Sequence, residues 1–98
     1  MIRAFNFRPM AKGSLRALVD IEVVRSGLIL RNCAWFRNAY GKEWVALPAQ
    51  RHERPDGVAR FTPLVEFSSS TWEARQRLQE AALVAIRAVM AIDEEAKR

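Results

Sequence analysis

The sequence predicts an α+β fold, a small antiparallel β-meander of about five strands with one long C-terminal helix packed on the sheet. From the start of the chain to about residue 67, apolar residues recur with a period of two, which is typical of half-buried strands. After residue 68 they recur at intervals of three and four, which is typical of a helix with one buried face. We therefore expect a single domain over residues 1–98, with strands in about 2–67 and the helix in about 71–92.

The clearest strand is predicted over residues 15–24, LRALVDIEVV. Alternate residues from Leu15 onward are apolar, so this side is expected to be buried. Asp20 and Glu22 lie on the other side and are expected to be a solvated face. A shorter strand over residues 2–8 should precede this one.

Three further strands are predicted between residues 28 and 67. Ser26-Gly27 comes just before LILRNCAWFRN, which we expect to be the hairpin partner of the strand over 15–24. The pattern resumes in KEWVALP, where Pro48 ends the strand because proline has no amide hydrogen to donate. The last strand, VARFTPLVEF, contains Pro63 and should therefore be bulged or lie at an edge.

A capping box predicts where the helix begins. Glu73 follows Ser70 by three residues, so each side chain can satisfy a free backbone amide of the first turn. The apolar stripe expected to face the sheet is Leu78, Ala82, Ala85, Val89 and Ile92. Leu83, Ile86 and Met90 lie beside this stripe, which suggests that the helix is buried on two sides and that the second side faces another subunit.

The composition excludes several classes of protein. With 50% hydrophobic residues among 98, the chain can bury a core without disulfides or metal. Cys33 has no partner within the chain, and no apolar run approaches the roughly 18 residues of a membrane helix, so we expect a cytoplasmic protein. One His, one Cys and no glycine-rich phosphate loop predict no metal, no cofactor and no enzymatic activity.

The positive charge lies in the first two thirds of the chain. Residues 1–69 contain 11 Lys and Arg against 6 Asp and Glu, whereas residues 70–98 contain 5 of each. A basic face attracts polyanions, so this distribution favours nucleic acid as a ligand. Basic domains without such a role are also common.

Basic residues gather around the apparent hairpin GKEWVALPAQRHERPDGVARF, residues 41–61, and are expected to form one positive rim that contacts phosphates. The candidate residues are Lys42, Arg51, Arg54, Arg60 and Arg37, with Arg75 and Arg77 as a second patch at the helix start. Exposed aromatic residues near the rim would stack on bases, as in single-strand binders. The alternatives are that the arginines form a solvated loop, and that Trp35, Trp44 and Trp72 each belong to the core.

Residues 44–71 resemble the stage V sporulation protein G (SpoVG) family. WVALP, RPDG and ARFTPLVEFSSST match the order of the family's proline-terminated strand, basic loop ending in proline-aspartate-glycine, short strand and serine-serine-threonine helix start. LRALVDIEVV and LILRNCAWF fall where the family has its second and third strands. The chain departs from the family at Ala49 and Gln50, which replace the start of a basic run, and at Trp72 and Glu73, which replace basic residues.

The resemblance implies a SpoVG-like domain, a homodimer, and a regulator that binds DNA and in some members RNA. We therefore expect a nucleic-acid-binding regulatory or accessory protein, with DNA and RNA both open. The alternative is a dimeric protein-protein interaction module, in which the sheet edge or the second side of the helix binds a protein partner and the arginines serve solubility.

Overall fold

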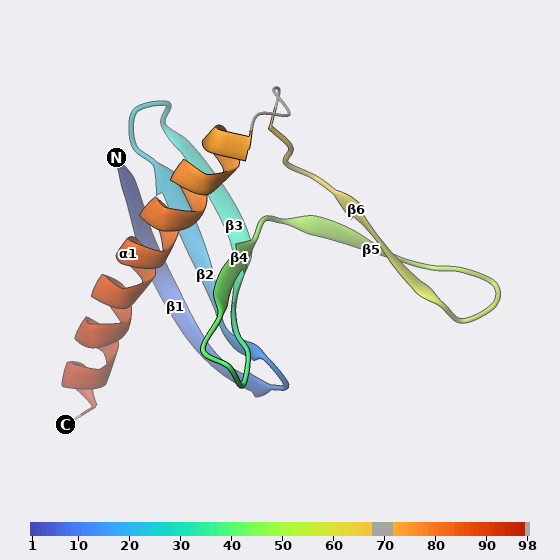
Figure 1. The fold of residues 1–98 in the computed structure, drawn as a ribbon, viewed down its shortest axis with the longest axis horizontal. Helices are drawn as coiled ribbons and strands as arrows, with labels where there is room; N and C mark the ends of the chain where they lie inside the picture. Colours follow the sequence, from blue (N-terminus) through green and yellow to red (C-terminus); the bar gives the residue numbers. More distant parts are fainter. Residues whose placement is uncertain (68–71, 98) are drawn as a thin grey trace.

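The computed structural model describes residues 1–67 and 72–97, and it confirms the α+β class. A four-stranded antiparallel sheet follows chain order, a separate two-stranded sheet comes next, and one helix lies across the larger sheet (Figure 1). The larger sheet consists of β1 (Ile2–Lys12), β2 (Leu15–Val23), β3 (Leu28–Arg37) and β4 (Glu43–Ala46). The smaller sheet consists of β5 (Ala49–Glu53) and β6 (Ala59–Pro63), and the helix is α1 (Trp72–Ala96).

The core lies between α1 and the larger sheet. Ala17, Val19 and Ile21 alternate along β2 and are all fully buried, which confirms the predicted apolar face of that strand. The other buried hydrophobic residues are Cys33 and Trp35 on β3, Val45 on β4, and Ala82 and Ile86 on α1. Among the described residues, no helix is long and apolar enough to cross a membrane.

The stripe of the helix that faces the sheet is wider than the predicted one. Ala82 and Val89 pack in the core as expected. Leu83 and Met90, which were expected with Ile86 to face another subunit, pack against the same core, so that expectation is wrong. Ile86, which we placed beside the stripe, is fully buried, whereas Ile92 is 66% exposed. The prediction missed this shift toward Ile86 because Ala81 and Ala88 widen the apolar pattern without indicating which part of it is buried. The helix extends beyond residue 92 to Ala96, and Ser70 of the predicted capping box lies outside the described residues.

The helix also protects the outer edge of β4. The side chain of Gln79 accepts a hydrogen bond from the backbone amide of Val45 at 2.8 Å and donates one to its carbonyl at 2.7 Å. Both groups of Val45 would otherwise be free, because β4 pairs only with β3. Arg87 of the helix adds an ion pair with Glu43 at 3.3 Å, so two polar side chains of α1 hold it against β4.

Residues 49–63 form a two-stranded arm that projects away from the larger sheet (Figure 1). The interpretation of Arg51 and His52 as loop residues is wrong, because both lie in β5, which pairs with β6. The arm turns at Pro55-Asp56-Gly57, where the Gly57 amide donates to the Arg54 carbonyl at 2.9 Å and Gly57 has a φ of 83°. A type I turn followed by a left-handed glycine is a usual three-residue hairpin connection.

Replacing Gln79 by alanine should leave the amide and carbonyl of Val45 unpaired at a partly covered edge. We expect Gln79→Ala to lower the free energy of unfolding by about 1–3 kcal/mol, as for other buried groups that lose their hydrogen-bond partner. Urea denaturation followed by tryptophan fluorescence measures this loss. Gln76→Ala is the matched control, because Gln76 is exposed on the same helix and its side chain bonds only Glu80 among the described residues. Equal losses in the two variants would contradict a role for Gln79 at the β4 edge.

Candidate nucleic-acid interface

The arm presents two different faces, because side chains alternate along each of its strands. The polar face of the arm carries the cross-strand pairs Gln50–Thr62 and His52–Arg60. The Phe61 face of the arm carries the pairs Ala49–Pro63, Arg51–Phe61 and Glu53–Ala59. All these side chains except Ala59 are exposed. The polar face therefore offers only hydrogen-bonding groups, including one Arg and one His, and no carboxylate.

Acidic neighbours do not lock the arginines of the arm in place. Arg51 lies 3.5 Å from Glu53, and Arg54 lies 3.9 Å from Asp56, with all four side chains largely exposed. Exposed ion pairs of this kind are weak and are screened by salt. Within the described part of the chain, Arg60 has no acidic partner. These three guanidinium groups are therefore available to an external anion.

The structure does not bring the predicted basic residues into one rim. Arg51, Arg54 and Arg60 lie on the arm, whereas Lys42 and Arg37 lie at the end of β4 that is distant in sequence from the arm (Figure 1). We expected the rim because the pattern of residues 41–61 is typical of one hairpin. Instead, β4 ends at Ala46 and the next strand belongs to a second sheet.

The two basic residues at the helix start also separate. Arg75 lies over the ring of Phe67, 5.9 Å from its centroid, and lines a pocket with Pro48 and Pro63 at the base of the arm. Arg77 is exposed two residues later on the same helix, about half a turn around from Arg75, where it lines a hollow with Trp72. Only Arg75 can therefore extend a contact surface that begins on the arm.

The three tryptophans occupy three different environments. Trp35 is buried as expected, and its indole nitrogen donates to Glu43 at 3.2 Å. Trp44 is half-buried and stacks on Phe36, with ring centroids 5.3 Å apart and planes at 8°. Trp72 is 75% exposed, so its expected place in the core is wrong. It lies at the first described residue of α1, where no sheet residue packs over it.

The side of the larger sheet that faces away from α1 is a second candidate surface, which we name the open face. Alternation from the buried residues places Asp20 and Glu22 of β2 on this face, paired with Phe5 and Arg3 of β1. The same alternation places Phe36 and Trp44 there. No helix or strand in the described ranges covers the open face.

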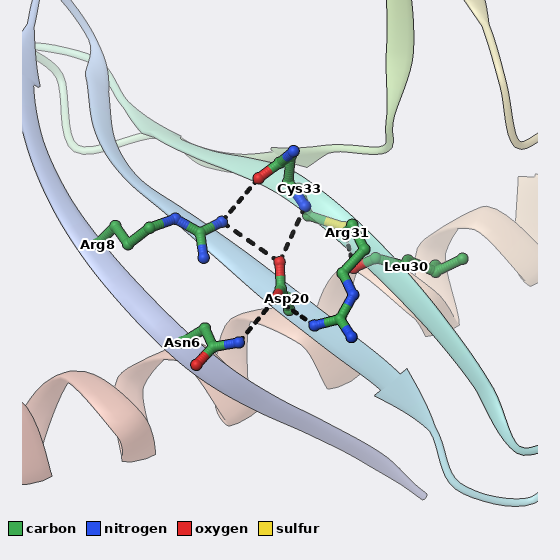
Figure 2. Close-up of polar contacts among 7 residues, drawn as sticks. Asn6, Arg8, Asp20, Leu30, Arg31 and Cys33 are labelled. Carbon is green, nitrogen blue, oxygen red and sulfur yellow. Dashed lines mark hydrogen bonds and ion pairs between the residues drawn. The ribbon is translucent and has the colours of Figure 1, made fainter.

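Asp20 is the centre of a polar cluster on the open face and is only 3% exposed (Figure 2). Its carboxylate accepts hydrogen bonds from Arg31 at 2.8 Å, Asn6 at 2.9 Å, the backbone amide of Asn32 at 3.0 Å and Arg8 at 3.3 Å. The expectation of a solvated Asp20 is therefore wrong. The neighbouring strands supply four donors that surround the carboxylate and exclude water.

Two β-bulges make this arrangement possible. The pairing of β1 with β2 shifts between Phe5 and Arg8, and the pairing of β2 with β3 shifts between Val19 and Ile21. An asparagine in the left-handed region lies at each shift, Asn6 with φ 51° and Asn32 with φ 57°. Asparagine tolerates this conformation better than most residues, and bulges redirect side chains. Two asparagines inside strand patterns were the sequence signal for the cluster.

The cluster controls the ionisation of two groups. Burial by itself would raise the pKa of Asp20, but the hydrogen bonds from Asn6, Asn32, Arg31 and Arg8 outweigh burial and hold this pKa well below its usual range. Cys33 is fully buried, and burial together with the charge of Asp20 raises its pKa to about 12. The thiol is therefore protonated at neutral pH and is a poor nucleophile. No metal-binding group of three His, Cys, Asp or Glu occurs in the described part of the chain.

The depressed pKa of Asp20 predicts a dependence of stability on pH. Its folded-state pKa lies below the unfolded value of about 3.9, so its contribution is present above roughly pH 4 and is lost as pH falls toward the folded pKa. Asp20→Asn should lower the free energy of unfolding at neutral pH by about 3 kcal/mol, because it leaves two guanidinium groups without their carboxylate. The same variant should show a smaller loss of stability below pH 4 than the wild type.

Urea denaturation between neutral and acidic pH tests this prediction. Glu22→Gln is the control, because it removes the ion pair with the exposed Arg3 on the same strand. It should lose about 1 kcal/mol or less. An Asp20→Asn variant as stable as the wild type at neutral pH would show that the cluster contributes nothing to folding.

Comparisons with known proteins identify neither a family for the chain nor a ligand for these two surfaces. The chain matches no protein-family model, no curated protein and no solved structure. The resemblance of residues 44–71 to the SpoVG family stays a prediction from the sequence, and the two surfaces described above are the basis for a function.

Proposed function

We propose that this protein binds nucleic acid in the cytoplasm and that the arm is its main contact with duplex DNA. The observation that carries the proposal is the polar face of the arm, with Gln50, His52, Arg60 and Thr62 on a ribbon that projects from the sheet. Arg54, beside the turn, adds positive charge next to this face, whereas Arg51 projects from the Phe61 face. Arginine binds phosphate through a planar fork of donors, which suits the backbone of DNA.

The dimensions of the arm fit the major groove of B-DNA. Strands of five residues span roughly 17 Å, and two paired strands lie about 4.8 Å apart. The major groove is about 12 Å wide and admits a two-stranded ribbon, whereas the major groove of A-form RNA is too narrow for side chains to read. Gln and Arg are side chains that pair with adenine and guanine edges in this groove.

The resemblance to the SpoVG family supports the same class of ligand and a regulatory or accessory role. Arg75 lies at the base of the arm and extends the proposed contact. Lys42, Arg37 and Arg77 belong to other parts of the surface, so the proposal does not depend on them.

A second candidate role, as a homodimer, is favoured by the Phe61 face of the arm. Phe61 is 66% exposed. An isolated two-stranded hairpin is only marginally stable in water, so burying Phe61 against a second copy would stabilise the arm. Near the base of the arm, an apolar pocket of about 240 Å³ is lined by Leu28, Leu47, Val65 and Phe67 among others. In a two-fold dimer, each arm can lay its Phe61 face on the same region of the partner. The polar face of each arm then stays free for DNA.

Removing the three arginines of the arm tests the proposed DNA contact. We expect the Arg51→Ala, Arg54→Ala, Arg60→Ala variant to bind labelled duplex DNA at least about 100-fold more weakly at low salt, with a flatter dependence on salt, because the arm loses the phosphate contacts of Arg54 and Arg60 and the nearby charge of Arg51. Fluorescence anisotropy measures both quantities.

The matched control removes the same charge elsewhere. Lys12, Arg16 and Arg25 are exposed, lie outside the arm and make no ion pair among the described residues. Their triple alanine variant should bind duplex DNA within about ten-fold of the wild type, through the loss of general attraction only. Equal weakening in both variants would remove the arm as a specific contact and leave net charge as the explanation.

The homodimer is tested by Phe61→Ser. This change should shift the chain toward monomer in sedimentation velocity at a given concentration, because it removes an apolar side chain from the proposed interface. Val84→Ser is the control, since Val84 is comparably exposed on the helix. A wild-type chain that is monomeric at high concentration, or a Phe61→Ser variant that dimerises normally, would contradict this interface.

A further inference from the structure

We infer that the open face of the larger sheet binds a single strand of nucleic acid, with Arg8 and Arg31 holding a phosphate while Asp20 fixes their orientation. This inference rests on the proposed nucleic-acid binding, but it uses a surface other than the arm. It assigns single strands to the open face and duplex DNA to the polar face of the arm.

Charge at the cluster matches the charge of a phosphodiester. Arg8 and Arg31 each form a hydrogen bond to the Asp20 carboxylate, Arg8 to one oxygen and Arg31 to the other, so their guanidinium groups flank one acceptor group (Figure 2). Two cations and one anion leave one positive charge, and a phosphodiester carries one negative charge. Both arginines are partly exposed. Their bonds within the described ranges use only one nitrogen of each, Nη2 of Arg8 and Nη1 of Arg31.

The arginines are held in place before any ligand arrives. Arg8 also donates to the side-chain oxygen of Asn32 at 2.9 Å, and Arg31 lies over the ring of Phe5, 5.7 Å from its centroid. Arg3 lies over the same ring at 5.4 Å. Ordering a long side chain on binding usually weakens affinity, and here much of that order already exists. The buried Asp20 carboxylate therefore links the strands and also orients two guanidinium groups for a ligand.

A groove connects the cluster to the arm. A hollow of about 350 Å³ is lined by Ile29, Arg31 and Asn32 of β3 and by Pro48, Leu64 and Val65 near the base of the arm. It follows the part of β3 that β4 does not pair with, since β4 pairs only with residues 34–37. A strand that leaves the arm can follow this groove to Arg31.

The shape and chemistry of the open face favour a single strand over a duplex. Phe36 and Trp44 lie on the same face as the cluster, stacked on each other and half-buried. Aromatic rings on a sheet surface can stack bases, but only bases that are not already paired within a duplex. A broad sheet surface also cannot enter either groove of B-DNA, unlike the narrow arm.

The first test inserts a negative charge into the groove without touching the cluster. Ile29 is 44% exposed beside Arg31, so Ile29→Glu should repel a phosphate. Because Ile29 pairs with Glu22 across the strands, circular dichroism must first establish that the variant is folded. We expect it to bind labelled oligothymidine about ten-fold more weakly than the wild type and to bind a mixed-sequence duplex within about two-fold. Ile92→Glu is the matched control, because it makes the same change on the exposed side of α1 and should alter neither affinity.

A second variant tests the phosphate contact directly. Arg31→Gln should reduce the slope of log affinity for oligothymidine against log salt by about 0.7, the value for one lost contact with a single strand. Circular dichroism establishes that this variant is folded before binding is compared. Inorganic phosphate, added at constant ionic strength, should displace oligothymidine poorly. Full displacement by inorganic phosphate would identify a site for free phosphate and would overturn the single-strand assignment.

The outcomes separate this inference from the proposed function. If neither oligothymidine nor duplex DNA binds at low salt, both fail. If duplex binding depends on the arm while Ile29→Glu and Arg31→Gln bind oligothymidine as the wild type does, the open face has no such role and the proposed function stands. Loss of single-strand binding in these two variants, with duplex binding kept, supports the inference.

Discussion

One helix can cover only one face of a four-stranded sheet, and this constraint shapes the rest of the molecule. Ile86 and the apolar side of β2 close the core on the covered face. The other face of β2 must then meet water or be covered by side chains of its own sheet. Asp20 is buried by the second route, with donors from β1 and β3 on either side. The middle of the sheet is thus closed on both faces, by apolar packing on one and by a saturated carboxylate on the other.

A buried carboxylate is unfavourable unless its hydrogen bonds compensate for lost hydration, and the two bulges supply that compensation. Asn6 and Asn32 break the regular ladder at the places where the backbone must bring donors toward Asp20. The same irregularities leave Arg8 and Arg31 at the surface, with N–H donors that no described residue accepts. A feature that holds three strands together therefore also creates a fixed pair of cations. Because the Asp20 cluster has both effects, we propose it as a ligand-binding site.

The sequence was sufficient to predict an element wherever a buried apolar face existed, although it misplaced Ile86 and Ile92 around the helix. Period-two alternation in β2 and β3 and the change of period before α1 gave the fold class and most of the sheet order. It failed for β5, since a strand that buries nothing has no apolar face to reveal it. It failed for Asp20 because the burial comes from residues on neighbouring strands, such as Arg31. For the candidate site, the sequence predicted the basic residues of the arm. It did not predict their separation from Lys42, because that separation follows from the end of β4 at Ala46.

The arm has little stability by itself, and the proposed ligands would stabilise it. Its strands contact chiefly each other, and a lone two-stranded ribbon has little apolar burial to offset the entropy of ordering it. A ligand on the polar face and a second copy on the Phe61 face would act on opposite sides, so each could stabilise the arm without displacing the other. Two arms related by a two-fold axis would then present their polar faces symmetrically, as in other dimers that read DNA. DNA binding and dimerisation should therefore strengthen each other through the order of the arm.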